Sequence, residues 1–458
     1  MKLERAKLHR SMHTIPALRW EDQELTSFAG LVLFQKLIQS LDLKGRLRAC
    51  VRHLPSASCY RPWKILLLLM VHLVLGWRRL RDLELYQSDP LVPRVLGLTR
   101  LPCASTLSRE LRRMDERVVE NLGEVCARLV LDRVVGMRRV TLDFDGSVQS
   151  TKSRRTQGSA VGFNPKSKGE RSYYPLLATV AQTGQVLAVH HRPGNVHDSH
   201  GAKDFIERCV GRVRATGFQG LLEARLDSAH FGDELCFWLH EQGVEFTISV
   251  PWARFPALKD HIDHRRRWTS VGGDWSFFEA KWFPHKWASQ GPGRFFRLFV
   301  FRHAVRDPRK GPIQGNLFEP CSRHYEYTAV ITNQHASARA VLHFHHGRGS
   351  QEHLFGELKS GLQLDYLATR REIGNRIYTL CGILAINVLR ELQMRASPRK
   401  TANTWKRAGL WMFETFRTFR KHFIQRAGRL TQPHGQLTLI VSAGHRAAAE
   451  FRHLLMAA

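Results

Sequence analysis

Three acidic residues that lie far apart in the chain are candidates to bind divalent metal ions together. Asp145 and Asp227 each stand at the end of a segment in which apolar and polar residues alternate, as they do in a β-strand. Glu352 lies in a segment whose apolar residues have the spacing of an α-helix. Hard cations such as Mg²⁺ prefer carboxylate oxygens, and two such ions commonly cleave phosphodiesters without a covalent protein intermediate. These acids therefore indicate metal-dependent phosphodiester chemistry, provided that the fold brings them to one point.

Asp143 is an alternative to Asp145. The two residues share a strand face, because side chains two positions apart on a strand point the same way. We prefer Asp145 because it stands directly before Gly146 at the strand end, where the strands of an α/β sheet open onto a crevice. For either acid alone a turn or cap role is the ordinary explanation, so the prediction depends on the whole set.

Glu352 shares one strip of its predicted helix with three other polar residues. With Arg348 at zero on a helical wheel, Lys359 falls at about 20°, Glu352 at about 40° and His345 at about 60°. A glutamate that binds metal, between cations that bind DNA phosphates, would suit this strip. A solvated face with Arg–Glu pairing produces the same pattern, so the strip by itself is weak evidence.

The charge of the chain indicates a polyanionic partner. Seventy Lys and Arg face forty Asp and Glu, which gives a formal net charge of +30. Such an excess favours nucleic acid, although ribosomal, membrane-surface and heparin-binding proteins are also basic. The eight cysteines form no CxxC pair and no zinc spacing, so we expect reduced thiols in a cytoplasmic protein. The longest apolar run, residues 65–76, is too short to cross a bilayer, and we predict a core helix.

The predicted fold class is α/β, with an RNase H-like catalytic core. In this core the chain order is three strands, two of them joined in a hairpin, then helix, strand, helix and strand. A helical N-terminal DNA-binding region precedes the core, and a β-rich insertion with five of the eleven tryptophans interrupts it. The predicted regions are the N-terminal region at 1–134, the core at 135–250 and 335–395, the insertion at 251–334, and a basic C-terminal region at 396–458.

Two further basic segments are candidates for DNA contact. Ser105 could cap a helix that carries Arg109, and a Ser/Thr/Arg-rich helix start suits phosphate, although a capped helix of a bundle is equally compatible. Between residues 395 and 429 the chain has ten Lys or Arg and one acid, interleaved with aromatic residues. A solvated charged face is the alternative there. The DNA contacts predicted from this segment are Lys406, Arg407, Arg420 and Lys421.

These residues together resemble the catalytic signature of bacterial insertion-sequence transposases of the insertion-sequence 4 superfamily. In that group the third acid stands in a Tyr-x2-Arg-x3-Glu-x6-Lys pattern. Arg348, Glu352 and Lys359 keep this spacing, whereas His345 stands at the Tyr position. Six other segments resemble the insertion-sequence 1380 family within the group: residues 26–30, 105–109, 142–147, 169–175, 193–195 and 225–231.

The resemblance covers roughly residues 25 to 395 and implies a DDE transposase. It implies that Asp145, Asp227 and Glu352 form the catalytic triad and hold two Mg²⁺ ions, with Mn²⁺ as an alternative. His345, Arg348 and Lys359 would contact DNA. In some relatives a Trp of the insertion stacks on a flipped base.

The same resemblance implies the reaction and the partners. The enzyme would cut double-stranded DNA at terminal inverted repeats, and the freed 3′-hydroxyl would attack target DNA. It would act as a homodimer in a synaptic complex, with no membrane partner, in the bacterial cytoplasm and on the nucleoid when bound to DNA. The alternatives are an RNase H-like nuclease without strand transfer and an inactive, transposase-derived DNA-binding protein.

Overall fold

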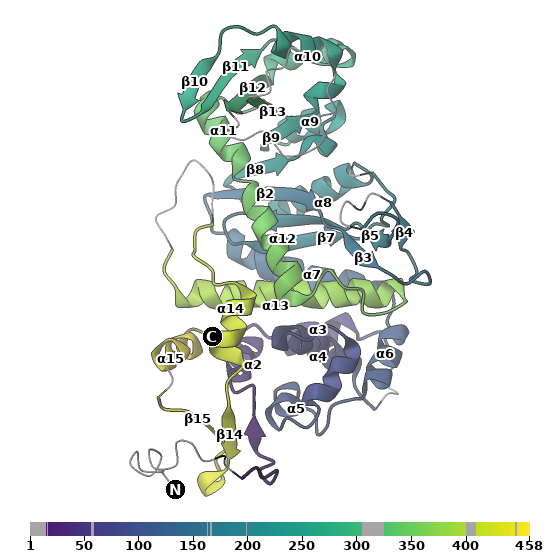
Figure 1. Cartoon of the computed structure of the whole chain (residues 1–458), viewed down its shortest axis with the longest axis vertical. Helices are drawn as coiled ribbons and strands as arrows, with labels where there is room; N and C mark the ends of the chain where they lie inside the picture. The colour runs from purple at the N-terminus through teal and green to yellow at the C-terminus, as the bar shows by residue number, and fades with distance from the viewer. Residues whose placement is uncertain are drawn as a thin grey trace.

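The computed structural model describes residues 15, 17–55, 59–162, 164, 167–197, 199–304, 325–399, 409–444 and 447–458. Along the long axis a set of N-terminal helices, a central sheet and an outer lobe follow one another (Figure 1). One apolar core joins the N-terminal helices to the last long helices of the chain, and a second lies on one face of the sheet. The protein is therefore a mixed α/β protein built around one large sheet.

The N-terminal region is helical, as predicted. Its helices are α2 (Leu31–Ser40), α3 (Leu43–Cys50), α4 (Pro62–Leu75), α5 (Leu91–Leu96), α6 (Ala104–Arg113) and α7 (Glu116–Val134). Pro62 occupies the first position of α4, and Gly76, with φ of +96°, ends this helix. Twelve of the fourteen residues of α4 are buried, which confirms the predicted core helix.

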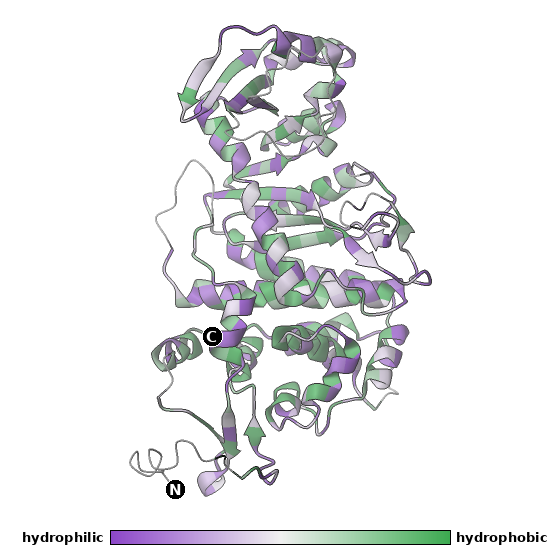
Figure 2. Cartoon of the chain, in the orientation of Figure 1, coloured by the Kyte–Doolittle hydropathy of each residue, from purple (hydrophilic) through white to green (hydrophobic). Residues whose placement is uncertain are grey.

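Helix α13 (Glu372–Ala396) lies between the N-terminal helices and the sheet (Figure 1). By length and composition it could cross a membrane, but its apolar stretch is wholly buried inside the protein. It packs against α4 and α7, and Figure 2 shows hydrophobic residues along its middle. In this structure α13 therefore serves as a central core helix, which the sequence pattern had not singled out.

The central sheet contains the strands that the sequence predicted for the core. They are β2 (Arg139–Gly146), β6 (Leu176–Val180), β7 (Gln185–His190), β8 (Leu221–Leu226) and β9 (Glu245–Val250). Strand β2 pairs in parallel with β8 and antiparallel with β6, and β8 pairs in parallel with β9. Helices α8 (Ala202–Ala215) and α9 (Asp233–Glu241) connect the later strands. This arrangement is consistent with an RNase H-like fold.

The predicted β-rich insertion extends the central sheet and does not form a separate one. Its strands are β10 (Thr269–Gly272), β11 (Trp275–Ala280), β12 (Arg297–Ala304) and β13 (Tyr325–Thr332), and helix α10 (Pro256–Asp263) precedes them. Strand β13 pairs antiparallel with β9, so the nine strands follow the order β10-β11-β12-β13-β9-β8-β2-β6-β7. The added strands form the outer lobe of Figure 1.

Two small sheets that the sequence did not predict complete the fold. One contains β3 (Gln149–Thr151), β4 (Ala160–Val161) and β5 (Arg171–Tyr173). The other joins β1 (Leu25–Thr26) to two C-terminal strands, β14 (Gly428–Thr431) and β15 (Thr438–Val441). Helices α14 (Phe416–Phe419) and α15 (Ala448–Ala457) also belong to the C-terminal region.

Candidate active site

The polar face of the central sheet is covered by two helices, α11 (Ala338–His346) and α12 (Gly349–Leu362) (Figure 1). On β2, Phe144 points to the opposite face and packs edge-to-face on Phe205 of α8, with ring centroids 6.1 Å apart. The alternate residues Thr141, Asp143 and Asp145 therefore face α11 and α12. This alternation is what places acids under the helix that carries Glu352.

Asp143 and Arg225 form a buried ion pair in the middle of this face. They lie opposite each other on β2 and β8. The guanidinium donates to both carboxylate oxygens, at 2.5 and 2.7 Å, and also to the carbonyl oxygen of Phe344 on α11 at 3.1 Å. Asp143 is only 1% exposed. Both oxygens of the Asp143 carboxylate are bonded to Arg225, so this residue serves the fold. The ion pair therefore favours Asp145 over Asp143 as the candidate ligand.

Asp145 lies near the carboxyl end of β2, and Asp227 directly follows the carboxyl end of β8, the strand that pairs with β2 in parallel. The register pairs residues 139–143 of β2 with residues 221–225 of β8 and ends at Asp143 and Arg225; continued by two residues, it would set Asp145 opposite Asp227. Because neighbouring strands are about 4.8 Å apart, we expect the two acids to lie close enough to share a ligand. Their side chains are 19% and 31% exposed, unlike the buried layer behind them.

Each of these two acids is held by local hydrogen bonds. Asp145 accepts from the backbone N–H of Gly146 at 2.7 Å and from Arg348 at 3.2 Å. Asp227 caps the short 3-10 turn η2 (Ser228–His230) and accepts from the N–H of Ala229 at 3.0 Å. Hydrogen bonds within the protein thus orient both carboxylates.

Glu352 lies in the first turn of α12 and is exposed. It is one helical turn beyond Arg348, whose guanidinium contacts Asp145. Within the described part of the chain, no three His, Cys, Asp or Glu side chains are close enough together to hold a metal ion. The structure therefore places Asp145 and Asp227 at the ends of adjacent parallel strands but does not gather the three acids, and their joint role as metal ligands stays a prediction.

The predicted strip of His345, Arg348, Glu352 and Lys359 is interrupted. Helix α11 ends at His346 and α12 begins at Gly349, so His345 belongs to a different helix from Glu352 and Lys359. Two glycines in the sequence Gly-Arg-Gly weaken a continuous helix here. Arg348 is the residue at the junction and caps α12, while Lys359 lies half-buried near its end.

His345 is not placed to contact DNA as predicted, because its ring is buried in the sheet face. Its two ring nitrogens form hydrogen bonds with the hydroxyls of Thr247, at 3.0 Å, and Ser249, at 2.8 Å, on β9. Burial and the nearby charge of Arg348 lower the pKa of His345 to about 3. The ring is therefore neutral and serves to attach α11 to the sheet.

Buried histidines should make the protein less stable in acid. Burial lowers the pKa of His72 to about 4 and that of His345 to about 3. Below pH 6.5 these histidines take up protons in the unfolded chain but not in the native state. The free energy of unfolding is therefore unaffected by them above pH 6.5, and it decreases as the pH falls from 6.5 to 4. The expected slope is about 1.4 kcal/mol per pH unit for each histidine, measured by urea unfolding.

The control for this pH effect is His72→Leu. Removal of one titrating group should make the fall in unfolding free energy between pH 6.5 and 4 shallower by about the same 1.4 kcal/mol per pH unit. Parallel curves for the wild type and the variant would contradict the assignment.

Among the other predicted DNA contacts, Arg420 needs correction. It is 7% exposed and donates to the carbonyl oxygens of Leu73, Val74 and Gly361, so it joins the end of α4 to α12. Four of the aromatic residues interleaved with this segment are also buried in the apolar cores: Trp411, Phe416, Phe419 and Phe423.

Of the other four cations predicted to contact DNA, the structure describes two. Lys421 and Arg109 are exposed, and their contact with DNA stays a prediction. Lys406 and Arg407 lie outside the described residues. Helix α6, which carries Arg109, begins at Ala104 with Cys103 as its N-cap, so Ser105 lies inside the first turn and is not the cap.

Helix α12 is held in place by residues that the sequence did not indicate. Glu357 is buried and pairs with Arg390 of α13, and it also accepts from the backbone N–H of Phe416 at 2.6 Å. Gln351 donates to the carbonyl oxygen of Asp143 at 3.0 Å. The polar residue types were visible, but only the fold shows that their partners lie on other elements.

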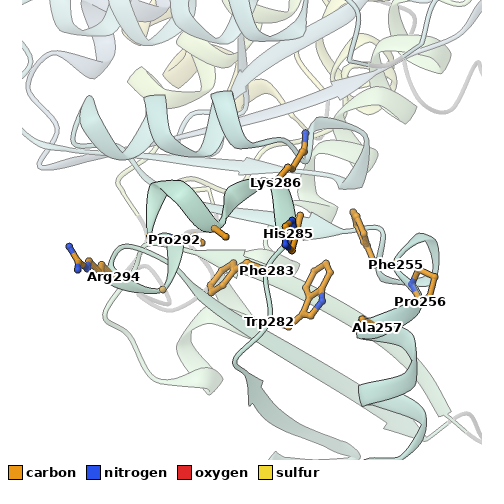
Figure 3. Close-up of a pocket in the computed structure, with 13 residues that line it drawn as sticks. Phe255, Pro256, Ala257, Trp282, Phe283, His285, Lys286, Pro292 and Arg294 are labelled. Carbon is orange, nitrogen blue, oxygen red and sulfur yellow. The ribbon is translucent and has the colours of Figure 1, made fainter.

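The tryptophans of the insertion mostly pack inside the outer lobe. Trp287 is fully buried and stacks on Phe231, with ring centroids 5.1 Å apart. Trp282 instead lines an apolar pocket of about 840 Å³ together with Phe255 and Phe283 (Figure 3). Which of these side chains contacts DNA stays open to experiment.

The comparisons with known proteins identify the family. The chain matches the model of the family described as transposase DDE domain group 1 over residues 17–270, which is more than half of its length and includes Asp145 and Asp227. No curated protein matches it. A solved piggyBac transposase synaptic complex with hairpin DNA is 12% identical, with a TM-score of 0.43, and the match covers 79% of this chain and 73% of that chain. By the match to its family model, the chain belongs to the DDE transposase domain family, group 1.

Proposed function

We propose that this protein cuts double-stranded DNA at the terminal inverted repeats of its element and joins the freed ends to target DNA. Membership in the DDE transposase family supports transposition in general. The observation that carries the finer proposal is the placement of two partly exposed carboxylates at the ends of adjacent parallel strands, Asp145 near the end of β2 and Asp227 directly after β8. The proposed assembly is a homodimer in a synaptic complex in the bacterial cytoplasm.

The donor set fits a divalent cation. Asp145 and Asp227 supply hard carboxylate oxygens, and Glu352 lies on the helix whose first residues contact Asp145. We propose Mg²⁺ as the ion, with Mn²⁺ as a substitute. When bound there, two such ions would activate water or a 3′-hydroxyl and stabilise the charge that develops on the phosphate.

The protein's own groups would position the DNA and the acids. Arg348 orients Asp145 and is one of the cations beside the candidate site, and Lys359 lies on the same helix as Glu352. Cations in these places favour the approach of a phosphodiester backbone. The bond that is broken resembles the bond that is made, so the reaction needs no external energy source.

The test uses a linear duplex that carries the native DNA flanking the coding sequence on both sides. The proposal predicts cleavage at the element ends with Mg²⁺ or Mn²⁺ and none with EDTA. Ends that are already cut should then join to a supercoiled plasmid. Cleavage without joining would indicate a nuclease, binding without cleavage would indicate a DNA-binding protein, and the absence of both would overturn the proposal.

A further inference from the structure

A cationic cleft lies between helix α6 and the loop that joins α12 to α13. Its volume is about 560 Å³. One wall comes from α6, a second from the segment that follows β3, and a third from residues 366–371. The lining includes three arginines and several hydroxyl groups but no Asp or Glu: Ser108, Arg112, Ser153, Thr369, Arg370 and Arg371.

The three arginines of this cleft are exposed and have no ion pair with any residue that the structure describes. Arg112 makes one weak contact, 3.4 Å from Nε to the carbonyl oxygen of Ser108 in its own helix. Glu372 follows Arg371, but its carboxylate lies against Gly158 and does not line the cleft. Three like charges that gather without an acid repel one another, so an anionic partner would stabilise this arrangement.

The cleft is built by hydrogen bonds between its walls. The backbone N–H of Gln157 donates to the carbonyl oxygen of Arg370 at 2.9 Å. The hydroxyl of Thr369 donates to the carbonyl oxygen of Arg371 at 2.9 Å, and the backbone N–H of Thr369 donates to the buried Asn375 at 2.8 Å. The arginine-bearing loop is therefore fixed relative to β3 before a ligand arrives.

We infer that this cleft binds the sugar–phosphate backbone of duplex DNA, and the inference rests on the proposed function. Arginine and hydroxyl donors are the groups that contact phosphate oxygens, and such contacts position the duplex without reading its sequence. Tyr366 is the one aromatic residue in the lining, and it is engaged by Arg78, whose guanidinium carbon lies 5.1 Å from its ring centroid. Base stacking, as on a single strand, is therefore disfavoured.

The cleft is linked to the candidate active site along the chain, through α12. The loop that carries Arg370 and Arg371 directly follows the helix of Glu352. Exposed Lys152, Arg154 and Arg155 follow β3 beside the cleft, and Arg109 lies about 60° around α6 from Arg112. A duplex held here would have further exposed cations within reach, on α6 and in the segment after β3.

The test compares two triple variants of the full chain in EDTA, which separates binding from cleavage. The cleft variant is Arg112→Gln, Arg370→Gln, Arg371→Gln. The matched control is Arg138→Gln, Arg208→Gln, Arg214→Gln, three exposed arginines at the start of β2 and on α8, which covers the opposite face. The probes are fluorescent duplexes with element-end and unrelated sequences, titrated at several salt concentrations, and circular dichroism checks folding.

The cleft variant should lose about eightfold in affinity at 0.1 M salt for each phosphate contact removed, equally for both duplexes. Its plot of log K against log salt should be shallower by about 0.9 per contact, whereas the control variant should keep the wild-type slope. Equal losses in both variants, or wild-type affinity of the cleft variant for both duplexes, would overturn the inference. If the cleft variant loses affinity but the wild type never cleaves DNA, the inference about the cleft is supported and the proposed function is refuted. If the wild type cleaves and the cleft variant binds normally, only the cleft inference fails.

Discussion

Asp227→Asn should abolish DNA cleavage and leave DNA binding intact. The carboxamide keeps the shape of the side chain, but it removes a charge that two divalent ions would need at the end of β8. The cleavage rate should fall below about one thousandth of the wild-type value, since even one lost stabilising donor costs 10²–10³ in other enzymes. Gel-based cleavage of the flanking-DNA duplex in Mg²⁺ measures the rate, and fluorescence anisotropy measures binding.

Asp145→Asn and Glu352→Gln should have the same effect as Asp227→Asn if the three acids act together. The matched control is Asp260→Asn, because this acid is exposed on α10 in the outer lobe. The control should cleave at the wild-type rate. Wild-type cleavage by the Asp227 variant would refute the assignment, and wild-type cleavage by the Glu352 variant alone would move the third ligand to another residue.

Arg225→Met should destabilise the protein by about 3–5 kcal/mol, because it leaves the buried carboxylate of Asp143 without a partner. Arg225 is fully buried, donates two hydrogen bonds to Asp143 and one to α11, and so joins β2, β8 and α11. Urea unfolding at pH 7.5 measures the loss. This effect is expected to be the largest on stability of any single change at the candidate site.

The double variant Asp143→Leu, Arg225→Met should recover most of that loss, because an apolar pair replaces the ion pair and no lone charge stays buried. The control is Glu279→Gln, which breaks an exposed ion pair with Arg297 and should cost no more than about 1 kcal/mol. An Arg225→Met variant that unfolds at the wild-type urea concentration would show that the buried pair does not stabilise the fold.

The order of elements in the core was predictable because the signals are local. The alternation of apolar and polar residues before Asp145 and Asp227 placed both acids at strand ends, and the structure has β2 and β8 there. Gly243, with φ of +63°, follows α9 as its helix-ending glycine, also as predicted. Such features depend on periods of two or 3.6 residues and on turn residues, which the sequence contains directly.

Other parts of the site depended on contacts between distant segments. Nothing local indicates that β13 would pair with β9 and extend the sheet, or that Arg225 would pair with Asp143, 82 positions away. The predicted polar strip was also wrong in part, because a helical wheel assumes one continuous helix. The structure has two helices that meet at residues 347–348, and His345 of α11 is buried against β9.

The basic C-terminal segment shows the same limit for charge. Net charge counts cations but does not say where they lie, and Arg420 is used to join α4 and α12 inside the protein. Conversely, the cleft of Arg112, Arg370 and Arg371 draws on segments more than 250 residues apart and could not be recognised from any one of them.

The sequence by itself determined the chemistry available to this protein: carboxylates at two strand ends, a third acid on a helix, and a large excess of positive charge. The tertiary structure decided which of these groups meet. The parallel pairing of β2 with β8 brings the strand ends that carry Asp145 and Asp227 to the same edge of the sheet, while its register pairs Asp143 with Arg225 and withdraws both from solvent. The physical reason is that burial and neighbours determine whether a charge is a ligand or a structural ion pair, and both arise only when distant segments pack.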